Sequence, residues 1–92
     1  MDDSSNAILS YQKCIEHELK CYTPDLHLVY NSHKSMAEAF EKLGQFDKAI
    51  EHAEHALDYA RQVFEPNTEE LVTIQTLLDG LREKPSNLVT EN

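Results

Sequence analysis

Apolar residues recur along most of the chain at spacings of three and four positions, which is the period of one face of an α-helix. Four stretches show this period, at residues 6–22, 26–43, 47–64 and 67–84. The expected core faces of the first two are Ile8, Tyr11, Ile15 and Leu19, and then Leu26, Val29, Tyr30, Met36, Ala37, Phe40 and Leu43. The runs of Val, Ile and Thr that are typical of strands are missing. The pattern predicts an all-α fold of about four helices.

Polar residues and helix breakers mark the expected helix ends. Candidate N-caps are Ser5, Asp25, Asp47, and Asn67 with Glu70 three positions later in a capping-box spacing. Gly44 is expected to end the second helix, because glycine adopts the left-handed conformation found at many helix ends. Pro66 and Pro85 end the third and fourth helices in the same prediction, since proline lacks the amide donor that a helix requires.

The chain repeats itself with a shift of 42 residues. The matching pairs include Ala7 with Ala49, Ile8 with Ile50, Ile15 with Leu57, Tyr22 with Phe64, Pro24 with Pro66, Val29 with Leu71 and Met36 with Leu78. A period between 20 and 50 residues is typical of stacked helical units. We expect antiparallel helical hairpins joined by short turns.

Four alanines lie on one side of the predicted third helix, namely Ala49, Ala53, Ala56 and Ala60. Small side chains allow a neighbouring backbone to come close, and the larger Phe40 and Leu43 fill the remaining space. We therefore expect close packing between the second and third helices.

The stretch "SHKSMAEAFEKLGQFDKAIEHAEHAL" resembles a tetratricopeptide repeat, whose pattern is W-x2-L-G-x2-Y, A-x3-F and A. The matching positions are Met36, Ala37, Phe40, Leu43-Gly44, Ala49 and Ala56, whereas His33, Ala53 and Arg61 stand in place of the usual Trp, Phe and Pro. The 42-residue length resembles the repeats of kinesin light chains and of the C-terminal helical region of SET- and MYND-domain methyltransferases.

This resemblance implies a short α-solenoid that acts as a non-catalytic protein-interaction module, scaffold or adaptor. The alternative is the C-terminal part of a larger enzyme, such as a SET/MYND-domain lysine methyltransferase, in which it shapes the substrate cleft. The resemblance also implies a ligand groove on the first helix of each hairpin. The partner-binding residues expected there are Asn31, Lys34, Glu38, Glu41, Thr73 and Thr76.

The order of the helices leaves the first one, at residues 6–22, without the partner that normally precedes it in such a stack. We expect this chain either to continue a longer solenoid or to cover the open face by forming a homo-oligomer. Residues 1–5 are expected to be a disordered start, 6–84 the folded domain and 85–92 a flexible tail.

The net charge indicates the class of partner, and the two cysteines indicate the cellular compartment. Seventeen acidic and eight basic residues give a net charge of −9, which disfavours nucleic acid and anionic lipid and favours a basic or neutral protein segment. "MDDSSN" lacks the features of a signal peptide. Cys14 and Cys21 are two turns apart on one predicted helix, too far to bridge, so two reduced thiols predict the cytosol or the nucleus.

Two groups of side chains contain potential metal ligands. Cys14, His17 and Cys21 share a helical face, but the sequence lacks a paired C-x2-C knuckle. His52 and His55 lie beside carboxylates, which are expected to raise their pKa values on a solvated face. We expect neither group to be a metal site, and the sequence predicts no cofactor and no catalytic residue.

Overall fold

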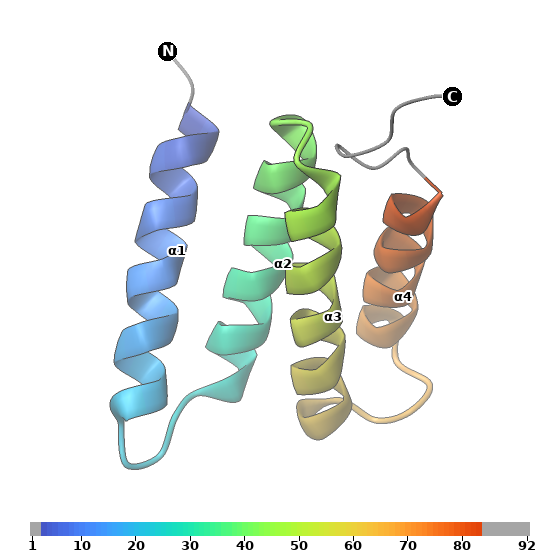
Figure 1. Cartoon of the computed structure of the whole chain (residues 1–92). Coiled ribbons are helices and arrows are strands. Elements are labelled where there is room, and N and C mark those ends of the chain that lie inside the picture. The colour runs from blue at the N-terminus through green and yellow to red at the C-terminus, as the bar shows by residue number, and fades with distance from the viewer. Residues whose placement is uncertain (1–2, 84–92) are drawn as a thin grey trace, which may run out of the picture.

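The computed structural model describes residues 3–83, and side chains from Ser4 onward. It contains four helices: α1 (Asp3–Lys20), α2 (Leu26–Lys42), α3 (Phe46–Val63) and α4 (Glu69–Arg82). No strand occurs among these residues, which confirms the all-α prediction. Consecutive helices run antiparallel and lie side by side in chain order (Figure 1). Met1, Asp2 and the tail predicted at 85–92 lie outside the described residues.

The structure confirms two of the predicted helix ends. The Asp25 carboxylate accepts a hydrogen bond from the Leu28 amide at 3.2 Å, so Asp25 caps the N-terminus of α2. Gly44 has a φ of 78° directly after the last turn of α2. The Gly44 and Gln45 amides then bond back to the Glu41 and Phe40 carbonyl oxygens, which closes the turn into α3.

Three predicted N-caps are wrong. Because α1 begins at Asp3, Ser5 lies inside its first turn, and residues 3–5 are helical. Gln45 occupies the cap position of α3, and Asp47 lies in the first turn, where a carboxylate still favours the positive end of the helix dipole. Asn67 precedes the cap of α4, which is Thr68. The Thr68 hydroxyl donates to the Glu65 carbonyl oxygen instead of capping the helix.

The end of α1 also differs from the prediction. The helix stops at Lys20, and the Tyr22 side chain is fully exposed. Pro24 disfavours the helical conformation at the residue before it, so the chain leaves the helix ahead of the proline. Leu19, expected on the core face, is 49% exposed because it lies on the last turn of this edge helix.

The predicted close packing is confirmed between α2 and α3, which form the most extensive contact in the described chain. All four alanines of the stripe, Ala49, Ala53, Ala56 and Ala60, are fully buried. Met36 and Ala37 of α2 are fully buried as well. The small side chains on α3 thus allow the larger residues of α2 to fill the interior.

The two copies of the repeat bury corresponding positions. Helices α1 and α3 start 43 residues apart, as do α2 and α4, which is within one residue of the period in the sequence. The corresponding pairs that are buried in both copies are Ile15 with Leu57, Ser32 with Ile74, Met36 with Leu78 and Ala39 with Leu81. The internal repeat is therefore retained in packing at these four positions, whereas Tyr30 is 3% exposed and its counterpart Val72 is 62% exposed.

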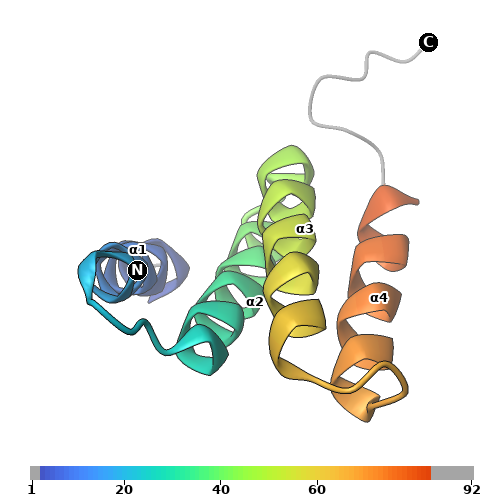
Figure 2. The same cartoon turned by 90° about the horizontal axis from the view of Figure 1, so that it is seen from below.

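Helices α1 and α4 lie at the two edges of the molecule (Figure 2). Helix α1 packs against α2 through Ile8 and Ile15, while Leu9 on its surface is 56% exposed. None of the described helices is both long and apolar enough to cross a membrane.

Candidate functional site

Two of the six predicted partner-binding residues line depressions in the structure, and the two depressions are different. Asn31, Glu38, Thr73 and Thr76 are exposed, and Lys34 and Glu41 are partly exposed. Glu38 lines a cavity between α1 and α2, whereas Thr76 lines a pocket between α3 and α4. Helix α3 stands between α2 and α4 in both views (Figures 1 and 2). The two halves of the predicted set therefore do not meet in either pocket.

Two adjoining pockets run along the junction of α3 and α4, with volumes of about 330 Å³ and 440 Å³. They share Leu57, Arg61 and Gln75, so they form one continuous depression, which we call the α3/α4 groove. The remaining lining residues of its apolar end are Pro66, Leu71, Val72 and Thr76. Those of its charged end are Glu54, Asp58, Leu78 and Arg82.

The apolar end follows from the way α4 is placed. Pro66 lies in the turn after α3, and α4 then packs against α3 through Ile74, Leu78 and Leu81. This leaves Val72 on the open side of the first turns, where it is 62% exposed. An exposed valine beside Leu71 and Leu57 gives the groove an apolar floor that solvent can reach.

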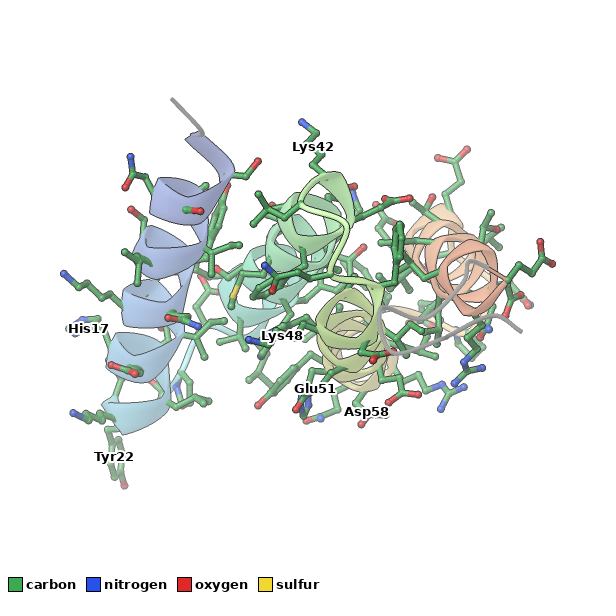
Figure 3. The ribbon with its side chains drawn as sticks, turned by 45° about the horizontal axis from the view of Figure 1, so that its top comes forward. His17, Tyr22, Lys42, Lys48, Glu51 and Asp58 are labelled. Atoms are coloured by element: carbon green, nitrogen blue, oxygen red, sulfur yellow. The ribbon has the colours of Figure 1, made fainter. Side chains whose placement is uncertain are left out.

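The charged end carries groups of both signs. Arg82 of α4 donates to the Glu54 carboxylate of α3 at 2.9 Å, and both side chains are about half exposed. An ion pair this exposed contributes little to stability, so Glu54 can exchange its partner at low cost. Asp58 projects from α3 into solvent on the same side as Glu51 (Figure 3).

Prediction from the sequence missed this groove, although the repeat contains a signal for it. The 42-residue shift maps Val72 onto Tyr30, which is only 3% exposed. Tyr30 is covered by Phe64 at the end of α3, with ring centroids 5.3 Å apart. In the first copy of the repeat, α3 therefore covers this part of the surface of α2. The corresponding part of α4 is open, and it forms one side of the α3/α4 groove.

A second cluster of polar side chains joins α2 to α3. His33 is 8% exposed, and its Nδ1 atom lies 3.1 Å from Nδ1 of His52. One ring nitrogen donates and the other accepts, with the roles set by the tautomers. The rings of Tyr59 and His55 also contact the His33 ring, at centroid distances of 5.7 and 5.1 Å. His33 therefore occupies a largely aromatic site.

Burial decides the protonation of these histidines. Loss of solvent lowers the pKa of His33 to about 4, and the neighbouring His52 and His55 act in the same direction. Burial also lowers the pKa of His52, although Glu51 opposes the shift. The expectation that carboxylates raise the pKa of His52 is wrong, because desolvation outweighs the charge of Glu51. The His33–His52 pair is a neutral hydrogen bond within the packing of α2 and α3.

The remaining candidate ligands lie on α1 or directly after it. Cys14 and Cys21 are free thiols and both are partly buried. The structure brings Cys21 close to His17 and Glu18, whereas Cys14 does not belong to this group.

No protein-family model matches the chain, and neither a search of curated proteins nor one of solved structures gives a match. The tetratricopeptide resemblance stays a prediction from the sequence.

Proposed function

We propose that this chain is a non-catalytic protein-interaction module of tetratricopeptide-like type, which binds a segment of a partner protein in the α3/α4 groove. The observation that supports this most is the continuity of the groove's apolar and charged ends, which share Leu57, Arg61 and Gln75. Peptide-binding grooves combine apolar pockets for anchor residues with charged groups that select the sequence.

The groove favours a segment with a particular chemistry. An apolar side chain fits against Leu57, Leu71 and Val72, where it removes exposed apolar surface from water. A lysine or arginine further along the segment fits beside Glu54 and Asp58. The net charge of −9 steers such a cationic segment towards the chain.

The internal repeat supports a helical form for the bound segment. In the first copy, the positions that correspond to the open side of α4 are covered by a helix, α3. An amphipathic helix of the partner that presents one apolar row to the groove occupies the equivalent place on α4. This is the helix-in-groove mode of peptide recognition.

A selected peptide and two neighbouring variants test the proposal. A peptide selected from a display library on this chain is labelled, and its affinity is measured by fluorescence anisotropy. Val72→Glu places a charge in the apolar end, so the affinity is expected to fall by about tenfold or more, since burying one valine contributes about 1.5 kcal/mol.

Thr73→Glu is the matched control, because Thr73 is also exposed, at the adjacent position, but does not line the groove. It introduces the same charge and is expected to leave the affinity within about twofold. The partner-binding role that the tetratricopeptide resemblance implies for Thr73 predicts a loss in this variant instead. Equal losses in the two variants, or a loss in Thr73→Glu alone, contradict the proposed site. Far-UV circular dichroism of both variants checks that α4 remains folded.

A further inference from the structure

Three potential metal ligands of different chemistry meet at the corner where α1 ends and the chain turns towards α2. They are the imidazole of His17, the carboxylate of Glu18 and the thiol of Cys21, and their donor atoms all lie within 4.8 Å of one another. We propose that this corner binds one zinc ion through His17, Glu18 and Cys21. This site is independent of the α3/α4 groove.

The backbone already holds these side chains in a suitable arrangement. His17 and Cys21 are four residues apart, the spacing at which two side chains lie on one helical face, as do the two zinc ligands of an H-E-x-x-H helix. The Cys21 amide bonds to the Glu18 carbonyl oxygen at 3.1 Å, which continues the helical turn as far as Cys21. The Cys21 thiol points back along α1, where it donates to the His17 carbonyl oxygen at 3.3 Å.

Glu18 is oriented by a contact from outside the cluster. One of its carboxylate oxygens accepts a hydrogen bond from the Asp25 backbone amide at 2.9 Å. Metal-binding carboxylates are commonly fixed by such a bond, which leaves the second oxygen for the ion. The same contact ties the corner to the start of α2, because Asp25 caps that helix.

The second copy of the repeat provides an internal comparison. The residues that correspond to His17, Glu18 and Cys21 are Tyr59, Ala60 and Val63, none of which has a donor suited to a divalent metal. Ala60 is fully buried, so that corner is held by packing. The corner after α1 thus carries three side chains of metal-ligand type, although the corresponding corner after α3 forms without any of them.

The donor set selects the metal. Nitrogen, oxygen and thiolate sulfur together suit zinc, which binds histidine at about 2.0 Å and cysteine at about 2.3 Å. His17 is exposed on the outer side of α1, so its ring is free to rotate and close these distances (Figure 3). Binding releases the thiol proton of Cys21 to solvent, and a water molecule takes the fourth position.

Cobalt(II) is the direct probe, since a cobalt–thiolate bond gives a near-ultraviolet charge-transfer absorption that histidine and carboxylate ligands do not give. The reduced full chain is titrated with cobalt, and zinc is then added as competitor. We expect the absorption to saturate at one equivalent and to disappear when zinc displaces cobalt.

Single substitutions assign the ligands. Cys21→Ser is expected to abolish the thiolate absorption, and His17→Ala and Glu18→Gln to weaken cobalt binding by about tenfold or more. Cys14→Ala, which removes the other thiol of the chain, and His52→Ala, which removes a rival imidazole, are expected to leave the absorption unchanged. His17 and Cys21 are not core residues, and far-UV circular dichroism verifies that the variants are helical.

Three outcomes overturn the proposal. One is the absence of thiolate absorption in the wild-type chain at millimolar cobalt. Another is absorption that persists in Cys21→Ser or is lost in Cys14→Ala, which places the metal on the other thiol. The third is cobalt binding that is lost in His52→Ala, which assigns the metal to the histidine cluster between α2 and α3.

Discussion

Burial of His33 makes the stability of the α2–α3 hairpin dependent on pH, and the lowered pKa of His52 acts in the same direction. The pKa of His33 is about 4 in the folded chain against 6.5 when unperturbed. Between these values the unfolded chain binds more protons than the folded one, so the free energy of unfolding rises with pH. The stability contributed by neutral His33 is complete above about pH 6.5 and is lost progressively as the pH falls towards 4. The loss is on the order of 1–3 kcal/mol, because solvent still stabilises part of the charge on the ring.

Urea unfolding at several pH values between 7.5 and 4, followed by circular dichroism with a chelator present, measures this loss. His33→Gln is expected to have a shallower pH dependence than the wild-type chain, because glutamine does not titrate. Equal slopes for wild type and His33→Gln would show that His33 does not titrate with folding.

The two glycines of the chain are expected to respond in opposite directions to the same substitution. Gly44→Ala forces a residue with a Cβ into a φ of 78°, which costs about 1–2 kcal/mol of stability. Gly80 lies inside α4, and a Cβ there meets no atom within 4 Å. Gly80→Ala therefore gains about 0.5–1 kcal/mol through helix propensity. Thermal unfolding of both variants measures the signs, and a stabilised Gly44→Ala would contradict the left-handed turn.

Single-residue properties were predictable where they depend on local sequence. Gly44 and Asp25 act at the ends of α2 as their residue types indicate. The lowered pKa of His52 was not predictable in this way, because it comes from burial against α2 in the folded chain, including a contact with His33 that is nineteen positions away.

Among the described helices, α3 has the strictest limit on the size of its buried side chains. Its alanine stripe is fully buried against α2 and the core, so a larger side chain must push the helices apart. Ala53→Leu is expected to lower the free energy of unfolding by about 1–3 kcal/mol. Gln62→Leu adds a leucine on the exposed part of α3 and is expected to change it by less than about 0.5 kcal/mol. Chemical denaturation of both variants measures the difference, and equal effects would contradict close helix packing.

The sequence predicted the helices and their packing better than it predicted the residue at which each helix begins. The 3.6-residue period and the repeat identified four helices, and the two copies bury matching residues. Ser5 was wrong as a cap because α1 begins two residues before it. Asp47 and Asn67 were wrong because Gln45 and Thr68 occupy the cap positions of α3 and α4, although neither makes a side-chain cap hydrogen bond. The choice among neighbouring caps depends on how the chain approaches each helix, which packing determines.

At the scale of the whole molecule, the proposed partner binding is expected to depend on the acidic net charge. The net charge of −9 attracts a cationic segment over distances that salt screens. The dissociation constant of the selected peptide is therefore expected to rise several-fold between low salt and about 0.5 M salt. Anisotropy titrations in a salt series measure it, with a peptide whose basic residues are replaced by glutamine as the salt-insensitive control. Affinity that is equal at all salt concentrations would contradict a role for Glu54 and Asp58.

The position of the groove depends on how the helices pack in the folded chain. Thr76, predicted from the tetratricopeptide resemblance, lines the α3/α4 groove, whereas Glu38 lines the cavity between α1 and α2. The rotation of each helix about its axis decides which side chains share a depression. A period in the sequence indicates which face of each helix is buried. It does not indicate which exposed side chains of neighbouring helices lie in the same depression.

Amide chemical-shift mapping by NMR tests the central claim most directly, because the chain is only 10.6 kDa and every backbone amide can be followed. The ¹⁵N-labelled chain is titrated with the selected peptide, and shift changes are mapped along the sequence. The α3/α4 groove predicts the largest changes between Glu54 and Arg82, with α1 nearly unaffected. Changes concentrated in α1 and α2, with none around Leu57 and Val72, would contradict the account.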